Sequence, residues 1–299
     1  MKYQSGGAFR RALENRLRVQ SLESGVALLR LRKMVTFDRF LARLMLAQPD
    51  AWMVKGGLAL QLRLAARART TKDVDVLLLT PHQDVHLLLI GAASLDVGDW
   101  FRFEVARPAG GLREDQFGGL RFHTSSLVDG RPFERFHVDV GIGDPIVELG
   151  EYLAMPALLE FADIRSTIVP CYPLTQQLAE KLHALTRPHL SGESSRVKDL
   201  VDILLIAELN GINGPLLLQA IQATFDARRT HPLPRQLPDP PPGWSTTFRR
   251  MASEVGLGYP TLAQAGPAAR RFLDPILQGE TWGTWDPAAW AWRSDRGEG

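Results

Sequence analysis

The feature that most constrains the fold is one segment, WMVKGGLALQLRLAARARTTKDVDVLLL (residues 52–79). It begins as a short strand, turns at Gly56 and Gly57, continues as a helix and ends on an aliphatic strand headed by Asp73 and Asp75. Residues two apart in a strand lie on the same face, so both carboxylates are expected on one side of a sheet. Two like charges held this close favour a cation between them.

The rest of the first half alternates between helical and strand patterns. Apolar spacing predicts helical structure over residues 8–47, and a helix is expected from Leu58 to Arg67 after the double glycine. Thr80 and Pro81 are expected as the N-cap and first residue of a further helix. Three later segments predict strands: WFRFEVA (100–106), LRFHTSSLV (120–128) and FERFHVDVGI (133–142), the last two joined by the turn Asp129-Gly130.

The second half is predicted to be mostly helical. Helices are expected in LTQQLAEKLHAL (174–185), RVKDLVDILLIAEL (196–209) and PLLLQAIQATFDARR (215–229), with two more before Leu277. Proline-rich residues 231–244 are typical of an extended strap, and the four tryptophans of the tail favour packing onto the body over base stacking. We therefore predict an α/β (α+β) protein, with N-terminal helices and a mixed-sheet core over residues 1–170 and a helical domain over residues 171–299.

The composition is that of an ordinary globular protein, with 45% hydrophobic and 23% charged residues among 299. The single cysteine, Cys171, excludes an internal disulfide framework and a thiol-based zinc cluster. No apolar run approaches the roughly 20 residues that span a bilayer, and the N-terminal sequence lacks the apolar core of a secretory signal. We expect a soluble cytoplasmic protein with no membrane partner.

A third carboxylate, Asp139 in FHVDVGIGDP, falls on a predicted strand that can lie beside the strand of Asp73 and Asp75. Three oxygen ligands suit Mg²⁺ or Mn²⁺ and not zinc. Such a site orients a nucleophile and offsets the charge of a triphosphate during in-line displacement. The double glycine fits this chemistry, because backbone N–H groups at a helix N-terminus bind anions. Each piece alone has a plainer interpretation: a Gly-Gly pair is usually just a turn, and Asp73 and Asp75 can cap the strand or pair with Arg69.

Lys181 is predicted to point inward. At about 100° per residue it falls within the apolar arc of Leu174, Leu178, Leu182 and Leu185. An inward ammonium needs an anionic partner, either a phosphate or a carboxylate. The alternative is that its stem covers apolar surface while its head reaches water.

The next helix places two carboxylates, Asp199 and Asp202, in a mostly enclosed position, because apolar residues surround them on both sides of the helix. Residues three apart are neighbours on a helix. The pair either holds Lys181 or Lys198 in a buried ion-pair network, or one of the two orients an attacking hydroxyl as a base.

Residues 1–50 carry ten Lys or Arg against four Asp or Glu, although the net charge of the chain is only +2. Only six of the 35 basic residues are lysines, and an arginine-rich composition also follows from genome base composition. This basic segment is therefore either an RNA contact or a solvated face. Its candidates for contact with an RNA backbone are Arg10, Arg11, Arg16, Arg18, Arg30, Arg32 and Lys33.

Four motifs in this order resemble the AbiEii/MenT-type nucleotidyltransferase toxins of the DNA polymerase β-like nucleotidyltransferase superfamily: KGGLALQLRLAARARTTKDVDVLLL, FHVDVGIGDP, YPLTQQLAEKLHALTRP and RVKDLVDILLI. The resemblance runs from about Trp52 to Leu209. It implies a minimal nucleotidyltransferase core followed by a helical C-terminal half, with the active site between the two. It also implies a bacterial toxin with a cognate antitoxin, which transfers a nucleotide from an NTP to RNA, above all to the tRNA 3′ acceptor end, and so blocks translation.

The expected site residues combine these motifs. Metal binding is expected at Asp73, Asp75 and Asp139, and nucleotide binding at Lys55, Gly56, Gly57, Arg69 and Lys181. The catalytic set comprises Asp73, Asp75, Asp139, Lys181, Asp199 and Asp202, with one of the last two essential.

The chain departs from the family pattern at the double glycine. The usual Gly-Ser of the superfamily is Gly56-Gly57 here, and Leu58 stands where many of these toxins carry threonine, so no hydroxyl contacts phosphate from that turn. Two rival functions stay open. One is the same chemistry on a small molecule or a protein hydroxyl, which needs no extended basic surface. The other is a non-catalytic module that binds RNA or another partner.

Overall fold

The computed structural model describes residues 2–80, 84–106, 119–188, 196–280 and 283–294. The chain divides into two compact units. The first unit comprises Met1–Arg63, Thr70–Gly143 and Gly150–Cys171, and the second comprises Leu64–Arg69, Asp144–Leu149 and Tyr172–Gly299. Two short segments from the first half of the sequence thus belong to the second unit.

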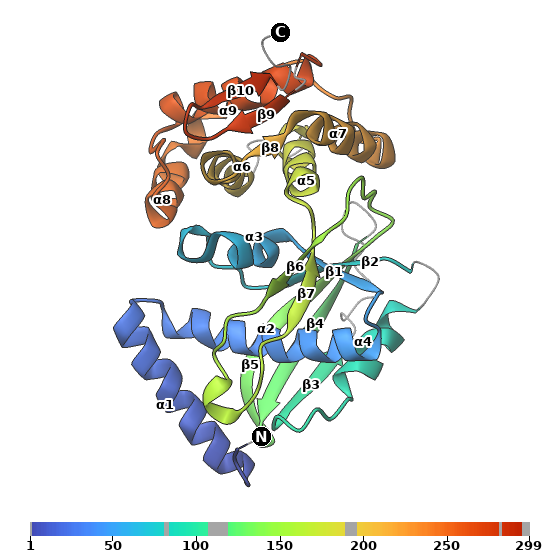
Figure 1. The fold of residues 1–299 in the computed structure, drawn as a ribbon, viewed down its shortest axis with the longest axis vertical. Coiled ribbons are helices and arrows are strands. Elements are labelled where there is room, and N and C mark those ends of the chain that lie inside the picture. The colour runs from blue at the N-terminus through green and yellow to red at the C-terminus, as the bar shows by residue number, and fades with distance from the viewer. Residues whose placement is uncertain (1, 81–83, 107–118, 189–195, 281–282, 295–299) are drawn as a thin grey trace. The chain divides into compact units, whose positions relative to one another are not determined.

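The first unit is built on a mixed seven-stranded sheet (Figure 1). Its strands are β1 (Trp52–Lys55), β2 (Val74–Leu78), β3 (Phe101–Ala106), β4 (Leu120–Val128), β5 (Arg131–Ile142), β6 (Glu151–Ala154) and β7 (Ile168–Cys171). They lie in the order β3-β4-β5-β2-β1-β7-β6. The β2–β5 and β1–β7 pairs are parallel and the other neighbours antiparallel. The predicted mixed α/β fold is confirmed, and the strands that carry the predicted carboxylates are neighbours.

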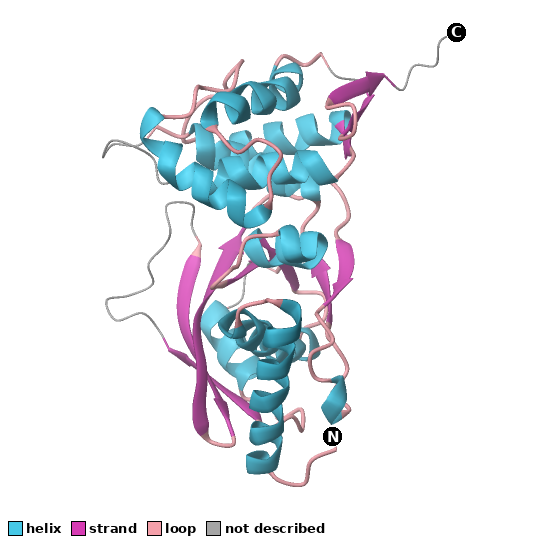
Figure 2. Cartoon of the chain, turned by 90° about the vertical axis from the view of Figure 1, so that its left-hand side faces the viewer, coloured by secondary structure: helices cyan, strands magenta, loops and turns pink. Residues whose placement is uncertain are grey.

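Helices cover one face of the long strands. The helices of this unit are α1 (Gly6–Ser24), α2 (Leu28–Ala47), α3 (Gly56–Leu64), α4 (Val85–Ala93) and the 3-10 turn η2 (Glu160–Ala162). Helix α2 packs on β5 and α4 on β3, and Figure 2 shows them on one side of the long strands. Phe40, Phe103 and Phe136 meet edge to face between these layers. On the opposite face, the outward residues of β4 and β5 are exposed or half-buried.

The capping residues show where α1 ends and where α4 begins. The helical residues 8–47 divide into α1 and α2, because Gly25 ends α1 in the left-handed conformation, with φ 69°. Thr80 is not the N-cap of the next helix, so that prediction is wrong. The carboxylate of Asp84 fills this role by accepting two backbone N–H bonds at the start of α4. Pro81 lies outside the described residues.

The second unit is mainly helical. Its elements are the 3-10 turn η1 (Ala65–Arg67), α5 (Leu174–Thr186), α6 (Val197–Leu209), β8 (Ile212–Asn213), α7 (Gly214–Arg228), the 3-10 turn η3 (Pro242–Trp244), α8 (Ser245–Val255), α9 (Leu262–Leu277), β9 (Gly283–Asp286) and β10 (Ala291–Ser294). The predicted helix from Leu58 therefore changes to a 3-10 turn after Leu64. Arg67 in that turn pairs with Glu208 on α6 at 2.6 Å. None of the described helices is both long and apolar enough to cross a bilayer.

The described tryptophans of the tail pack against the helices of this unit. Trp285 on β9 is 1% exposed and donates its Nε1–H to the backbone carbonyl of Ala207 at 2.7 Å. Trp292 stacks on Phe272 with ring centroids 5.6 Å apart. These contacts confirm packing as the role of these rings, while Trp282 lies outside the described residues.

Candidate active site

Four charged residues form one rung across the sheet of the first unit. Asp75 on β2 is the register partner of Asp139 on β5 and, on its other side, of Lys55 on β1. Asp139 is in turn the register partner of Arg121 on β4. Register partners on neighbouring strands share a face of the sheet. The rung therefore holds two carboxylates between two cationic residues.

Arg121 holds Asp139 through both carboxylate oxygens. Its Nε and Nη2 each donate a hydrogen bond of 2.6 Å, which is the bidentate geometry of a strong ion pair. The hydrogen bonds that Arg121 donates to Asp139 raise the pKa of Arg121 against the effect of burial, and Asp73 and Asp75 raise it further. The Arg121 side chain is 49% exposed, so solvent screens the pair and its contribution to stability is small.

Asp73 lies one rung further along, beside two histidines. Its Oδ1 is 3.0 Å from Nδ1 of His137 on β5. The ring of His137 meets the ring of His123 on β4 with centroids 4.6 Å apart. The three carboxylates predicted as a site, Asp73, Asp75 and Asp139, therefore leave one face of the sheet from neighbouring positions.

The double glycine follows β1 at the start of α3, and Gly56 packs against Asp75. Gly56 has φ +62°, and a Cβ added there would overlap the carboxylate of Asp75. A Cβ at Gly57 would lie 3.0 Å from Oγ1 of Thr71. Only glycine combines this backbone conformation with this close approach. The turn thus brings backbone N–H groups of a helix N-terminus beside Asp75.

The three carboxylates offer the oxygen donors that Mg²⁺ and Mn²⁺ prefer. Within the described part of the chain, no group of three or more His, Cys, Asp or Glu side chains is gathered closely enough to hold a metal ion. The reason is local, because Asp139 is turned to Arg121 and Asp73 to His137. The donor set fits a divalent cation, and two of its three carboxylates are hydrogen-bonded to Arg121 and His137 in this structure.

The second unit has a charged cluster of its own, formed by Lys181 on α5, Asp202 and Asp199 on α6, and Arg69. Lys181 Nζ lies 2.6 Å from Asp202 and 3.4 Å from Asp199. Arg69 donates to both oxygens of Asp202 at 2.8 Å. Arg69 is therefore an ion-pair partner of Asp202. The Lys181 side chain is only 12% exposed, as its place on the apolar arc predicted.

In this cluster, burial and the neighbouring charges shift the pKa values in opposite directions, and the effect of the charges is the larger one. Burial alone would lower the pKa of Lys181, but the carboxylates of Asp202 and Asp199 outweigh it, so the pKa is raised. Burial alone would raise the pKa of Asp202, but Lys181 and Arg69 outweigh it, so the pKa is lowered. Burial likewise opposes the charge of Arg69, but Asp202 raises its pKa, so Lys181, Arg69 and Asp202 are all charged at neutral pH.

The two aspartates of α6 differ in whether both carboxylate oxygens accept hydrogen bonds. Asp202 accepts hydrogen bonds on both oxygens and is 2% exposed. Asp199 is 5% exposed, and its Oδ2 accepts no hydrogen bond from any described residue. Arg196 lies 3.7 Å from that oxygen. Asp202 is thus the centre of the ion-pair network, and Asp199 retains a free acceptor atom.

A sequence profile described as nucleotidyl transferase AbiEii toxin, type IV TA system, matches residues 39–275, which is most of the chain. The chain belongs to the AbiEii family of nucleotidyltransferase toxins. This assignment places it among transferases of toxin–antitoxin systems and confirms the family that the four motifs indicated.

One solved structure shares this fold at low sequence identity. The nucleotidyltransferase toxin MenT4 from Mycobacterium tuberculosis is 19% identical with a TM-score of 0.54, and the alignment covers 89% of this chain and 98% of MenT4. JHP933 from Helicobacter pylori is 13% identical with a TM-score of 0.42, over 83% of this chain and 94% of that one. A search of curated proteins gave no match.

Two residues beside the AbiEii carboxylates were not predicted from the sequence. Arg121 and His137 contact Asp139 and Asp73 and follow the same two-residue alternation in β4 and β5. The alternation of apolar and polar residues in LRFHTSSLV and FERFHVDVGI was the sequence pattern from which these two residues could have been predicted as outward-facing. It gives the outward residues of each strand, but the pairing of Arg121 with Asp139 depends on the strand register, which the alternation does not specify.

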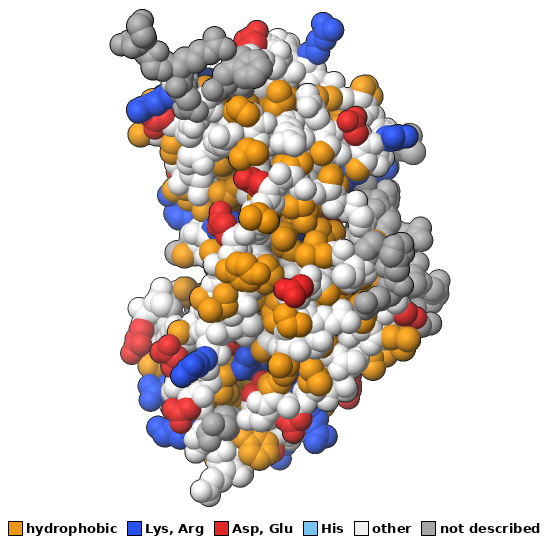
Figure 3. All heavy atoms as spheres, turned by 45° about the vertical axis from the view of Figure 1, so that its right-hand side comes forward, with side chains coloured by type: hydrophobic (Ala, Val, Ile, Leu, Met, Phe, Trp, Pro, Cys, Tyr) orange, Lys and Arg blue, Asp and Glu red, His pale blue; other side chains and the backbone are white. Residues whose placement is uncertain are grey.

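The basic N-terminal segment of this AbiEii chain is partly structural. Arg10 donates to three backbone carbonyls near the β4–β5 turn, and Arg32 pairs with Glu134 at 2.6 Å. The buried ammonium of Lys33 donates to the carbonyls of Lys72 and Arg135. These three cannot serve as freely available phosphate contacts. On the face drawn in Figure 3, Lys and Arg side chains alternate with acidic ones and form no continuous basic patch.

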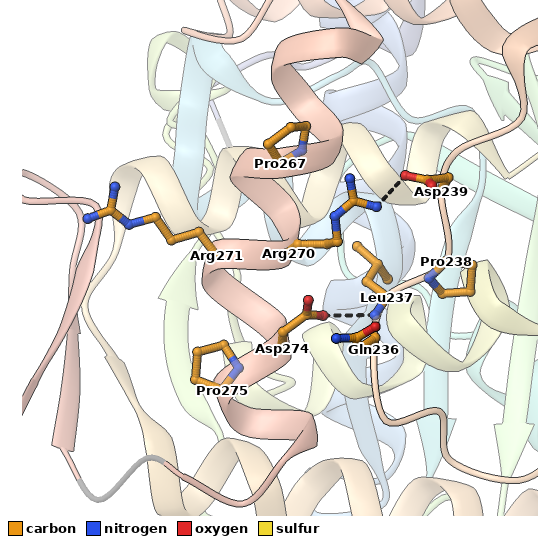
Figure 4. Close-up of a pocket in the computed structure, with 9 residues that line it drawn as sticks. All are labelled: Gln236, Leu237, Pro238, Asp239, Pro267, Arg270, Arg271, Asp274 and Pro275. Carbon is orange, nitrogen blue, oxygen red and sulfur yellow. Dashed lines mark hydrogen bonds and ion pairs between the residues drawn. The ribbon is translucent and has the colours of Figure 1, made fainter.

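A groove of about 930 Å³ lies in the second unit, between the proline-rich strap and α9. Arg270 reaches across it to Asp239, and Asp274 accepts a hydrogen bond from the backbone N–H of Leu237 at 2.8 Å (Figure 4). Arg271 points away from the strap. None of the predicted site residues of this AbiEii protein lines the groove.

Proposed function

We propose that this chain transfers a nucleotide from an NTP to the 3′ hydroxyl of an RNA, with the tRNA acceptor end as the preferred acceptor, and that this modification blocks translation. The observation that carries the proposal is the set of three carboxylates, Asp73, Asp75 and Asp139, on one face of adjacent strands beside a double-glycine turn. Family membership supplies the class of reaction.

The three carboxylates are proposed to hold Mg²⁺ or Mn²⁺. Such a cation, when bound, offsets the charge of the triphosphate and of the leaving pyrophosphate. The backbone N–H groups of Gly56 and Gly57 are proposed to bind phosphate oxygens, and Lys55 adds a cationic side chain at the end of β1.

In the second unit, Lys181 and one of the α6 aspartates are proposed to be essential. The free Oδ2 favours Asp199 as the residue that accepts a hydrogen bond from substrate. Asp202 is then a positioning residue, since its oxygens are taken by Lys181 and Arg69. In this proposal Arg69 acts on the nucleotide indirectly, by orienting Asp202.

The partners follow from the same proposal. NTP and tRNA are substrates of the bacterial cytoplasm, so we propose that the protein acts there. The family profile describes a type IV toxin–antitoxin system, and we propose that a cognate antitoxin counteracts the activity.

Transfer of labelled nucleotide tests this function. Purified protein is incubated with Mg²⁺, each α-labelled NTP in turn and total tRNA, and the expected result is label in the tRNA band with one or two of the NTPs. Asp75→Asn is the matched inactive control, because it removes a carboxylate without changing the size of the side chain. Label on protein or on a small molecule would overturn the RNA acceptor. Absence of pyrophosphate release with every NTP and acceptor would overturn the transferase and favour a binding module.

A further inference from the structure

The open face of the first unit's sheet carries a second set of ordered side chains beside the carboxylates. In β4 and β5, Phe122 and Val138 are fully buried on the helix side, whereas Arg121 and His123 are exposed on the other side. Outward residues of an antiparallel pair face one another in rungs. The rungs run in the order Arg121–Asp139, His123–His137 and Ser125–Arg135.

These rungs make a continuous path that ends at the carboxylates. The His123 and His137 rings meet edge to face in its middle, and Arg135 stands at its far end. Asp139 and Arg135 are four residues apart on β5, which corresponds to about 14 Å at about 3.4 Å per strand residue. That is the length of about four stacked nucleotides.

The chemistry of the path suits an unpaired nucleic acid strand. Imidazole rings and guanidinium planes are surfaces on which splayed-out bases stack. Arg135 on β5 and Arg102 on β3 expose guanidinium groups that can pair with phosphates. Glu104 on β3, opposite Ser125, is the acidic residue at the outward positions of that strand. A duplex offers no free base faces to such a surface, so a single strand fits it better.

We infer that this open face of β3, β4 and β5 binds the last unpaired nucleotides of an RNA 3′ end, with bases on His123 and His137 and phosphates at Arg135 and Arg102. The inference rests on the proposed function, since it names the surface by which the acceptor RNA reaches the carboxylates. It replaces the basic N-terminal helix as the main RNA contact.

The test measures the affinity of the protein for an eight-nucleotide single-stranded RNA with a free 3′ hydroxyl. Fluorescence anisotropy gives this affinity at several salt concentrations. His123→Ala should weaken binding at least about five-fold, because one base loses its stacking partner. His123→Phe should restore most of the affinity, since it keeps a stacking ring. Arg135→Gln should lower the slope of log K against log salt by about 0.7, as expected for one lost phosphate contact. Arg249→Gln, an exposed arginine of α8, is the matched control and should change neither quantity.

Melting temperatures confirm that each variant is folded, and the labelling assay separates the inference from the function. If wild type labels RNA and the His123 and Arg135 variants bind it normally, the inference is overturned and the function stands. An equal loss of affinity in Arg249→Gln, or equal affinity for a blunt duplex, also overturns it. If wild type neither labels nor binds RNA, the proposed function and the inference are overturned together.

Discussion

Asp75 on β2 and Asp139 on β5 are register partners on adjacent parallel strands, and each has a cationic register partner on its far side. Lys55 lies beside Asp75, and Arg121 beside Asp139. The sheet therefore compensates two neighbouring carboxylates without a metal ion. Repulsion between the carboxylates destabilises this arrangement, and attraction to the flanking cations stabilises it. The effect of a substitution at Asp75 or Arg121 depends on which of these interactions it removes.

Asp75→Asn should lower nucleotide transfer at least about a hundred-fold while changing the free energy of unfolding by less than about 1 kcal/mol. Transfer falls because the variant loses a proposed metal ligand. The free energy of unfolding changes little because the lost repulsion from Asp139 and the lost attraction to Lys55 have opposite effects on it. Labelled-nucleotide transfer and thermal melting with and without Mn²⁺ measure the two effects. A variant that keeps the metal response of wild type would rule out Asp75 as a ligand.

Arg121→Gln should bind Mn²⁺ more tightly than wild type, by about ten-fold. The guanidinium occupies both oxygens of Asp139 and adds a positive charge beside the carboxylates, so its removal favours another cation. Isothermal titration with Mn²⁺ measures the change. Weaker binding would mean that Arg121 instead holds Asp139 in the orientation that the cation needs.

Lys181→Met should lower the free energy of unfolding by about 3–5 kcal/mol, because it leaves buried carboxylates short of a cation. Lys198→Met, on the exposed side of α6, is the matched control and should change it little. Urea unfolding measures both. Adding Asp199→Asn to Lys181→Met should recover part of the loss, since Asp202 still has Arg69. No recovery would show that packing of the lysine stem, not charge, is what the substitution removes.

Gly56→Ala should destabilise the protein more than Gly57→Ala. Gly56 has φ +62°, which costs a non-glycine residue about 1–2 kcal/mol, and its Cβ would also overlap Asp75. Gly57 has no positive φ, and Thr71 needs to shift only slightly to admit a Cβ. Chemical unfolding of the two variants compares them. Equal losses would argue against the left-handed turn at Gly56.

Acidification should destabilise the protein through His183. Burial, and then the positive charge of Arg228, lowers the pKa of His183 to about 3, whereas the unfolded value is about 6.5. Between these values the unfolded chain binds a proton that the folded chain does not. The contribution is therefore complete above about pH 6.5 and is lost as the pH falls, by up to about 1.4 kcal/mol per pH unit. Urea unfolding between pH 7 and 4 measures this slope, and His183→Gln should reduce it.

The sequence was informative where one local pattern decides the structure. The alternation in β4 and β5 and the Asp-x-Asp pair were enough to predict the strands and the shared face of Asp73 and Asp75. Apolar periodicity was likewise enough to place Lys181 on the inner face of α5. The roles of these residues in nucleotide and metal binding stay predictions.

Long-range pairing was not predictable in the same way. The ion pair of Arg43 with Asp99 is fully buried and joins residues 56 apart, and neither residue stands in a recognisable motif. The short strands β6 and β7 were missed because four residues carry too little periodicity to distinguish them from a loop. Arg10 and Lys33 looked like free charges, since the carbonyls that they bind come from distant strands.

The bond from Trp285 to the carbonyl of Ala207 has a consequence for synthesis of the protein, because the two residues are 78 positions apart. At about 5–20 residues per second, Ala207 is added to the chain about 4–16 s before Trp285, whose indole packs against α6. Throughout that interval, the helix that carries Asp199 and Asp202 lacks its contact with the Trp285 side chain. The newly made chain therefore completes the packing around the helix of these two aspartates only late in translation.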